Sequence, residues 1–167
     1  EVDYGATIAD SPEDLAGMLA VMREAGVDLF NVSSRKFRKP EWPDREQPGH
    51  GIAQWARSFT DAPVMTCGSV GLDLEMFANL FDDEEPAEMM VERDLALLAG
   101  RVRERTIDLV GIGRMHIANP DFVARVRAGR ARELHLFNKK IHLASLAEAM
   151  AAEPGLVEES RKVADVD

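Results

Sequence analysis

The sequence predicts an α/β fold built around a parallel β-sheet. Three short apolar runs, at residues 27–32, 63–67 and 107–112, are rich in branched side chains and bounded by glycine, proline or charged residues. Such runs are typical of strands in a covered parallel sheet. Helical patterns precede, separate and follow these runs, and this alternation indicates right-handed βαβ units.

The composition indicates a globular protein with an acidic surface. The chain has 167 residues, of which 46% are hydrophobic and 30% charged, and its net charge is −10. This length suits one domain with a core of useful size, and the balance of residues excludes a disordered chain. Because an acidic surface repels phosphate backbones and anionic lipids, we expect a small-molecule substrate and neither nucleic acid nor a membrane as the partner.

Two further features bear on the setting of the protein. Cys67 is the only cysteine, which excludes an internal disulfide framework and is typical of a reducing, cytoplasmic compartment. The first residue is Glu1 rather than Met, so we expect the chain to be part of a longer protein.

The first helix is predicted from its own start and stop signals. Ser11 is a suitable N-cap, and Pro12 is favoured in the first helical turn. Four apolar residues then recur at helical spacing and define the face expected to be buried: Leu15, Met18, Leu19 and Met22. Gly26 can end the helix.

Four further helical patterns follow. Residues 51–59 form a short one, and residues 88–105 form the clearest, with an apolar stripe of Val91, Leu95, Leu98 and Val102. The next begins at Asn119-Pro120-Asp121 and ends at Gly129, with three apolar side chains expected inside: Phe122, Val123 and Val126. The last covers residues 142–152 and leads into an acidic tail.

Glycines follow two neighbouring predicted strands at the edge where α/β folds bind ligands. The first loop is Gly68-Ser69-Val70-Gly71, and the second contains Gly113 and Arg114. Glycine lets backbone N–H groups approach an anion closely, and the arginine fork suits phosphate oxygens. These loops predict a phosphate site, although glycines that only make turns, with Arg114 paired to a surface acid, remain the alternative.

A dense basic run, residues 35–39, follows the first predicted strand. It is either a solvated loop or a basic rim at the ligand end, where Phe37 and Trp42 would line an opening. The four histidines and Cys67 show no spacing typical of metal ligands, so we predict no metal site. Packing or surface roles are expected for them.

The three strand regions together resemble the old yellow enzyme family, the NADH:flavin oxidoreductases that fold as FMN-dependent (β/α)8 TIM barrels. The resemblance rests on residues 26–33 (GVDLFNVS), 63–71 (PVMTCGSVG) and 108–114 (DLVGIGR), with residues 118–121 (ANPD) and 137–140 (FNKK). It implies the C-terminal portion of such a barrel, about strands 6–8. Residues 1–146 would then form a partial flavin-binding barrel, and residues 147–167 a helical and acidic tail.

The resemblance also implies an activity and a cofactor site. Family members pass hydride from NAD(P)H through FMN to α,β-unsaturated carbonyl compounds, which is ene-reductase chemistry. The FMN phosphate would be held by five residues: Gly68, Ser69, Val70, Gly113 and Arg114. The family's catalytic Tyr and His residues belong to earlier strands, so we assign no catalytic residue here and expect the chain by itself to be inactive.

Two other functions stay open at the level of sequence. One is a non-catalytic half-barrel that binds a phosphate ligand or serves in assembly. The other is a different phosphate-binding barrel enzyme, such as an isomerase or aldolase, which would need a catalytic Lys or Glu at a strand end. None of the three predicted strand ends shows one, so this alternative ranks last. Three strands leave two unpaired edges, so we expect self-association or completion by a missing N-terminal half-barrel.

Overall fold

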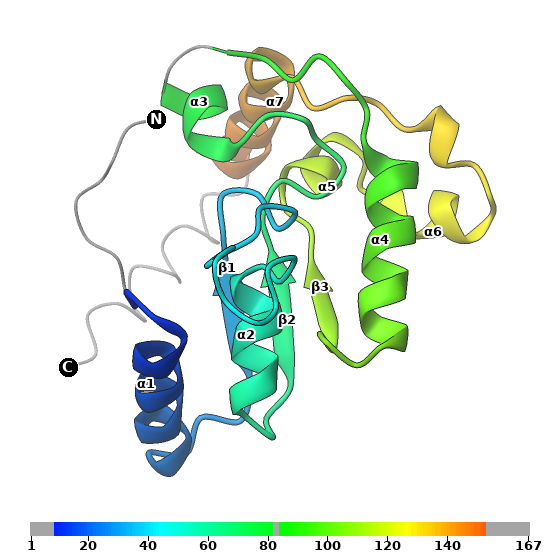
Figure 1. Cartoon of the computed structure of the whole chain (residues 1–167). Coiled ribbons are helices and arrows are strands. Elements are labelled where there is room, and N and C mark those ends of the chain that lie inside the picture. Colours follow the sequence, from blue (N-terminus) through cyan, green and yellow to red (C-terminus); the bar gives the residue numbers. More distant parts are fainter. Residues whose placement is uncertain (1–8, 82–83, 153–167) are drawn as a thin grey trace. The chain divides into compact units, whose positions relative to one another are not determined.

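A computed structural model describes residues 9–81 and 84–152 (Figure 1). The chain divides into two compact units, each described by itself. The unit that we call the sheet unit comprises residues 9–71 and 90–112 of the described chain. The unit that we call the helical unit comprises residues 72–81, 84–89 and 113–152.

The sheet unit contains three parallel strands, as predicted. They are β1 (Phe30–Ser33), β2 (Val64–Cys67) and β3 (Leu109–Gly111), paired in the order β1-β2-β3. Each strand is shorter than the apolar run that predicted it. The helices of this unit are α1 (Pro12–Glu24), α2 (Ile52–Phe59) and α4 (Val91–Arg103).

Helix α1 begins where the sequence predicts. The Ser11 side chain accepts a hydrogen bond from the backbone N–H of Asp14 at 3.1 Å, and Gly26 follows the helix with a φ of +98°. That left-handed conformation favours glycine. Leu15 and Leu19 are buried, but Met22 is 42% exposed, so the expected four-residue face is wrong at its last position.

The core of the sheet unit lies between the sheet and its helices. Alternate strand residues point into it, because successive side chains of a strand face opposite sides. Phe30 and Val64 lie opposite each other across β1 and β2, and both are buried. The other face carries Asn31, Met65 and Leu109, which are aligned across the three strands, and Leu109 is 45% exposed.

Helix α4 buries only part of the predicted stripe. The buried residues are Val91, Asp94, Leu98 and Arg101, whereas Val102 is 42% exposed. The Arg101 guanidinium donates to the carbonyl of Phe37 at 2.9 Å, and Asp94 has partners described below. The predicted stripe is therefore confirmed at Val91 and Leu98, half-buried at Leu95 and wrong at Val102, because hydrogen-bonded charged groups take buried positions on this helix.

The helical unit is built from short elements: α3 (Met76–Phe81), α5 (Arg114–Ala118), α6 (Phe122–Arg127), a 3-10 turn at Ala131–Glu133, and α7 (Lys139–Ala152). Only α6 and α7 were predicted. The helix that contains Phe122 buries that residue but leaves Val123 52% exposed, contrary to expectation. Helix α7 begins three residues before the expected start, where the Asn138 side chain accepts from the backbone N–H of Ile141 at 3.1 Å.

Two predictions concern the C-terminal part of the chain. The division after residue 146 stays a prediction, and residues 153–167 of the predicted acidic tail lie outside the described residues. Within the described residues, no helix has the length and apolar character needed to cross a bilayer.

Candidate phosphate-binding site

The loops that follow β1 and β2 are joined by backbone hydrogen bonds. The N–H of Ser34 donates to the carbonyl of Cys67 at 2.8 Å, and the N–H of Phe37 donates to the carbonyl of Gly68 at 3.1 Å. The Ser34 hydroxyl also donates to the Cys67 carbonyl at 3.1 Å. The basic segment 35–39 is therefore fixed against the loop 68–71 within the sheet unit.

Position 68 requires glycine because the backbone of Ser34 lies very close to it. The φ of Gly68 is +148°, and a Cβ placed there would lie 2.2 Å from the carbonyl oxygen of Ser34. No side chain fits at that distance. The first glycine of the predicted phosphate loop thus serves the contact between the two strand-end segments.

Ser69 has an unusual backbone that its neighbours support. Its φ is +52°, in the left-handed region that costs a non-glycine residue roughly 1–3 kcal/mol. Its hydroxyl donates to the carbonyl of Arg35 at 2.7 Å, and its own carbonyl accepts from the Arg38 guanidinium at 3.4 Å. The next residue, Val70, is 5% exposed and belongs to the core.

Asp94 of α4 lies beneath this loop, and sequence reasoning missed it. Its side chain is fully buried, its Oδ2 accepts from the backbone N–H of Gly71 at 2.8 Å, and the same oxygen pairs with the guanidinium of Arg38. The available signal was its spacing: Asp94 lies three residues after Val91 and four before Leu98, on the apolar stripe.

Gly113 and Arg114 begin helix α5 in the helical unit. Gly113 is the N-cap, no side chain caps this end, and a Cβ on Gly113 would have nothing within 4 Å. The Arg114 guanidinium donates to the carbonyl of Leu74 at 2.7 Å and to Oδ1 of Asn79 at 3.0 Å. Burial lowers the pKa of the Arg114 guanidinium, which remains charged at neutral pH.

The five predicted phosphate-site residues thus fall into two groups. Gly68, Ser69 and Val70 belong to the sheet unit, and Gly113 and Arg114 to the helical unit. In the first group, Gly68 lies against the Ser34 carbonyl, the Ser69 hydroxyl donates to Arg35, and Val70 is buried. In the second group, Arg114 donates to Leu74 and Asn79. Their union in one site stays a prediction.

Phe37 and Trp42, predicted to line a substrate opening, lie in different surroundings. Phe37 is 2% exposed, and its ring has the guanidinium carbons of Arg38 and Arg101 at 5.3 and 5.4 Å from its centroid. Its ring is therefore part of the core. Trp42 lines a hollow of about 630 Å³, formed by residues 39–45. Its ring packs edge-on against that of Trp55, with the two ring centroids 5.8 Å apart.

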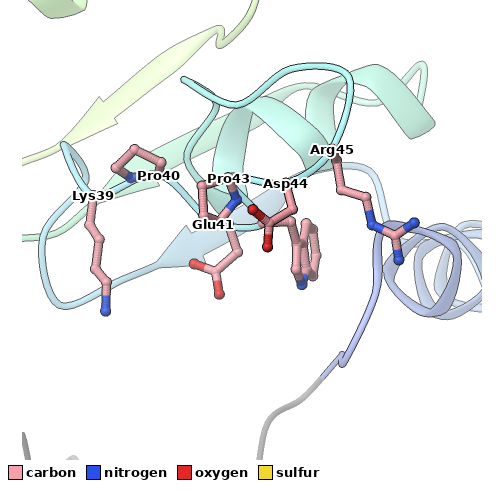
Figure 2. A pocket seen from close by; sticks show the side chains of 7 residues that line it. Lys39, Pro40, Glu41, Pro43, Asp44 and Arg45 are labelled. Carbon is pink, nitrogen blue, oxygen red and sulfur yellow. The ribbon is translucent and has the colours of Figure 1, made fainter.

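The hollow has charges of both signs along its wall. Figure 2 shows Lys39 and Arg45 at its two ends, with Glu41 and Asp44 between them. A wall of this kind can contact a polar ligand through either sign of charge, while the Trp42 ring offers an apolar surface. Among the described residues, no group of three or more His, Cys, Asp or Glu side chains is arranged to hold a metal ion.

No family model and no curated protein matches this sequence. Among solved structures, a neighbour is morphinone reductase in complex with tetrahydroNAD, with a TM-score of 0.52 and 19% sequence identity. The match covers 83% of this chain and 29% of the morphinone reductase chain, so this chain spans less than a third of that protein.

The likeness concerns the fold. Morphinone reductase is a TIM-barrel protein and a member of the old yellow enzyme family, and it shares with this chain an α/β arrangement around parallel strands. At 19% identity, the structural neighbour shows a likeness of fold alone.

Proposed function

We propose that this chain supplies the FMN phosphate-binding loops of a flavin oxidoreductase barrel of the old yellow enzyme kind. The observation that carries the proposal is the sequential parallel sheet β1-β2-β3, with a glycine-rich loop after β2 and an uncapped helix start after β3. Those are the places where barrel enzymes bind phosphate. The resemblance in sequence and the likeness to morphinone reductase in fold support the same family.

The residues present suit a phosphate group in different ways. A Cβ added at Gly113 would have nothing within 4 Å, which leaves room for an anion near the start of α5, and helix starts favour anions. Arg114 would contribute a permanent charge. The Ser69 hydroxyl donates to Arg35, so the loop 68–70 would act through its backbone rather than through this side chain.

When bound, FMN would accept hydride from NAD(P)H and pass it to an α,β-unsaturated carbonyl compound. The residues of this chain would bind and orient the phosphate end of the cofactor, and we assign none of them to the hydride step. A closed barrel needs further strands, from the remainder of a longer polypeptide or from another chain. Turnover is accordingly expected of the completed barrel.

The test compares FMN with riboflavin, which lacks the phosphate. Titration of the purified chain, followed by quenching of flavin fluorescence, should show binding that favours FMN by about tenfold or more, equivalent to about 1.4 kcal/mol. Gly113→Asp should abolish that preference by placing a carboxylate at the start of α5. Gly113→Ala is the matched control, because the added methyl group has nothing within 4 Å.

Equal affinities for the two flavins, or failure of the chain to bind either, would contradict the proposal. So would a Gly113→Asp variant that keeps the preference for FMN. Arg114→Ala is the less decisive variant, because Arg114 also anchors Leu74 and Asn79 and its loss would disturb the helical unit.

A further inference from the structure

We propose that Arg38 and Asp94 form a positioning pair that holds the loop 68–71 in the conformation needed to bind phosphate. This inference rests on the proposed function and extends it to two residues that do not contact the ligand. Both residues belong to the sheet unit, as does the loop itself.

Asp94 fixes the end of the loop. Its carboxylate is 0% exposed, and Oδ2 accepts from the N–H of Gly71 at 2.8 Å while pairing with Arg38. A buried carboxylate is costly to desolvate, and it is retained only where charged and hydrogen-bonding partners compensate. The bond to Gly71 is therefore held firmly, because breaking it would leave the buried charge with fewer partners.

Arg38 fixes the middle of the loop. Its side chain is 15% exposed, and its Nη1 both pairs with Asp94 and donates to the carbonyl of Ser69 at 3.4 Å. This hydrogen bond stabilises the backbone of Ser69, whose φ of +52° is unfavourable in isolation. One guanidinium thus links α4 to the strained position of the loop.

The pair also reduces the electrostatic repulsion that the Asp94 carboxylate would exert on a phosphate bound at this loop. An unpaired carboxylate beneath Gly71 would repel an anion through a medium that screens poorly. Arg38 neutralises that charge at close range. The loop can therefore present backbone N–H groups to a phosphate above a pair with no net charge.

The decisive variant replaces the pair with apolar side chains, Arg38→Met/Asp94→Leu, because exchanging a buried ion pair for hydrophobic residues usually preserves the fold. The matched control is Arg57→Met/Asp108→Leu. Asp108 likewise accepts a backbone N–H, that of Val64 at 2.9 Å, and pairs with Arg57 at 2.8 Å, but it does so at the start of β2. Each double variant thus removes one ion pair and one hydrogen bond to a backbone N–H, at the start of β2 in the control and in the loop after β2 in the other, and the control pair is the more exposed of the two.

Two measurements are made on each protein: amide hydrogen exchange at Gly71 and Val64, and the ratio of FMN to riboflavin affinity. Arg38→Met/Asp94→Leu should speed exchange at Gly71 and reduce the FMN preference about tenfold, as expected if the competent loop falls to about a tenth of its population. Its affinity for riboflavin should not change. The control should speed exchange at Val64 and keep the FMN preference.

Several outcomes would overturn the inference. One is unchanged exchange at Gly71 in the Arg38→Met/Asp94→Leu variant, and another is faster exchange there with the FMN preference intact. Equal loss of affinity for both flavins would show a merely structural role. Arg38→Lys offers a milder variant, which keeps the charge but not the planar fork, and an intermediate loss of the preference is expected.

The failure of this inference is distinguishable from the failure of the proposed function. If the wild-type chain shows no preference for FMN, the proposed function is wrong, and the positioning role in phosphate binding falls with it. If the wild-type chain prefers FMN and the Arg38→Met/Asp94→Leu variant does so equally, only the positioning pair is wrong.

Discussion

The side-chain amide of Asn119 pairs with both backbone groups of His135. Its Oδ1 accepts from the His135 N–H at 2.7 Å, and its Nδ2 donates to the His135 carbonyl at 2.8 Å. Nδ2 also donates to the carbonyl of Met115 at 3.1 Å, and the side chain is 2% exposed. One residue therefore joins the end of α5 to the segment that precedes α7.

Asn119→Ala should lower the free energy of unfolding by about 1–3 kcal/mol, because it leaves the polar groups of His135 without that partner. Urea unfolding followed by circular dichroism measures the change. Asn119→Asp keeps the acceptor oxygen and loses the donor to the His135 carbonyl, so it should also lower the free energy of unfolding. An alanine variant as stable as the wild type would show that water replaces these bonds without loss.

Gly68→Ala should destabilise the chain by at least about 2 kcal/mol, because its Cβ would meet the Ser34 carbonyl at 2.2 Å. The matched control is Gly17→Ala in α1, where nothing lies within 4 Å. That substitution should stabilise by roughly 0.5–1 kcal/mol through helix propensity. Opposite signs in thermal unfolding are the expected result, and equal effects would contradict the close approach at Gly68.

Stability should fall as pH drops through the range in which His50 titrates. Burial, with the positive charge of Arg101, lowers the pKa of His50 from its ordinary value of 6.5. The unfolded chain then binds this proton more readily, so stability is full above 6.5 and declines as pH falls through the folded pKa. Urea midpoints across this range should decline less in His50→Phe, which keeps a ring against Trp55.

This histidine effect is separable from that of the carboxylates. Hydrogen bonds from arginine side chains lower the pKa values of Asp61 and Asp121 below 3.8, so their contribution is lost only in stronger acid. A His50→Phe variant with the same pH dependence as the wild type would contradict the role of His50.

We expect the purified chain to self-associate unless further strands complete it. Among the described residues, β1 and β3 each pair on one side, and Leu109 of β3 is 45% exposed. Exposed apolar surface beside unpaired strand edges favours association. Leu109→Lys should weaken it in sedimentation equilibrium, and a monodisperse wild-type monomer would contradict the expectation.

The elements that the sequence predicted well are those defined by adjacent residues. Ser11 and Pro12 mark the start of α1 by local chemistry, and the branched runs mark the three strands. The buried face of α4 could not be predicted in this way. Asp94 is stabilised by Arg38, which lies 56 positions away, and Arg101 by the Phe37 carbonyl, 64 positions away.

The same limit applies to the candidate site. Glycines and an arginine after neighbouring strands could be predicted from residue type and order. Sequence could not show that the Ser69 hydroxyl donates to Arg35, or that Arg114 is anchored by Leu74 and Asn79. Phe37 was predicted at an opening because its segment directly follows the first strand, at the ligand end of the fold, yet its ring is buried near the guanidinium groups of Arg38 and Arg101.

The order of the two units along the chain has a consequence for biosynthesis. The sheet unit is interrupted after Gly71 and resumes at Met90. A ribosome therefore delivers Arg38 and the loop 68–71 well before it delivers Asp94. Until α4 leaves the exit tunnel, the nascent loop has no carboxylate to receive the Gly71 amide, so this contact of the loop forms only after a further 23 residues have been added.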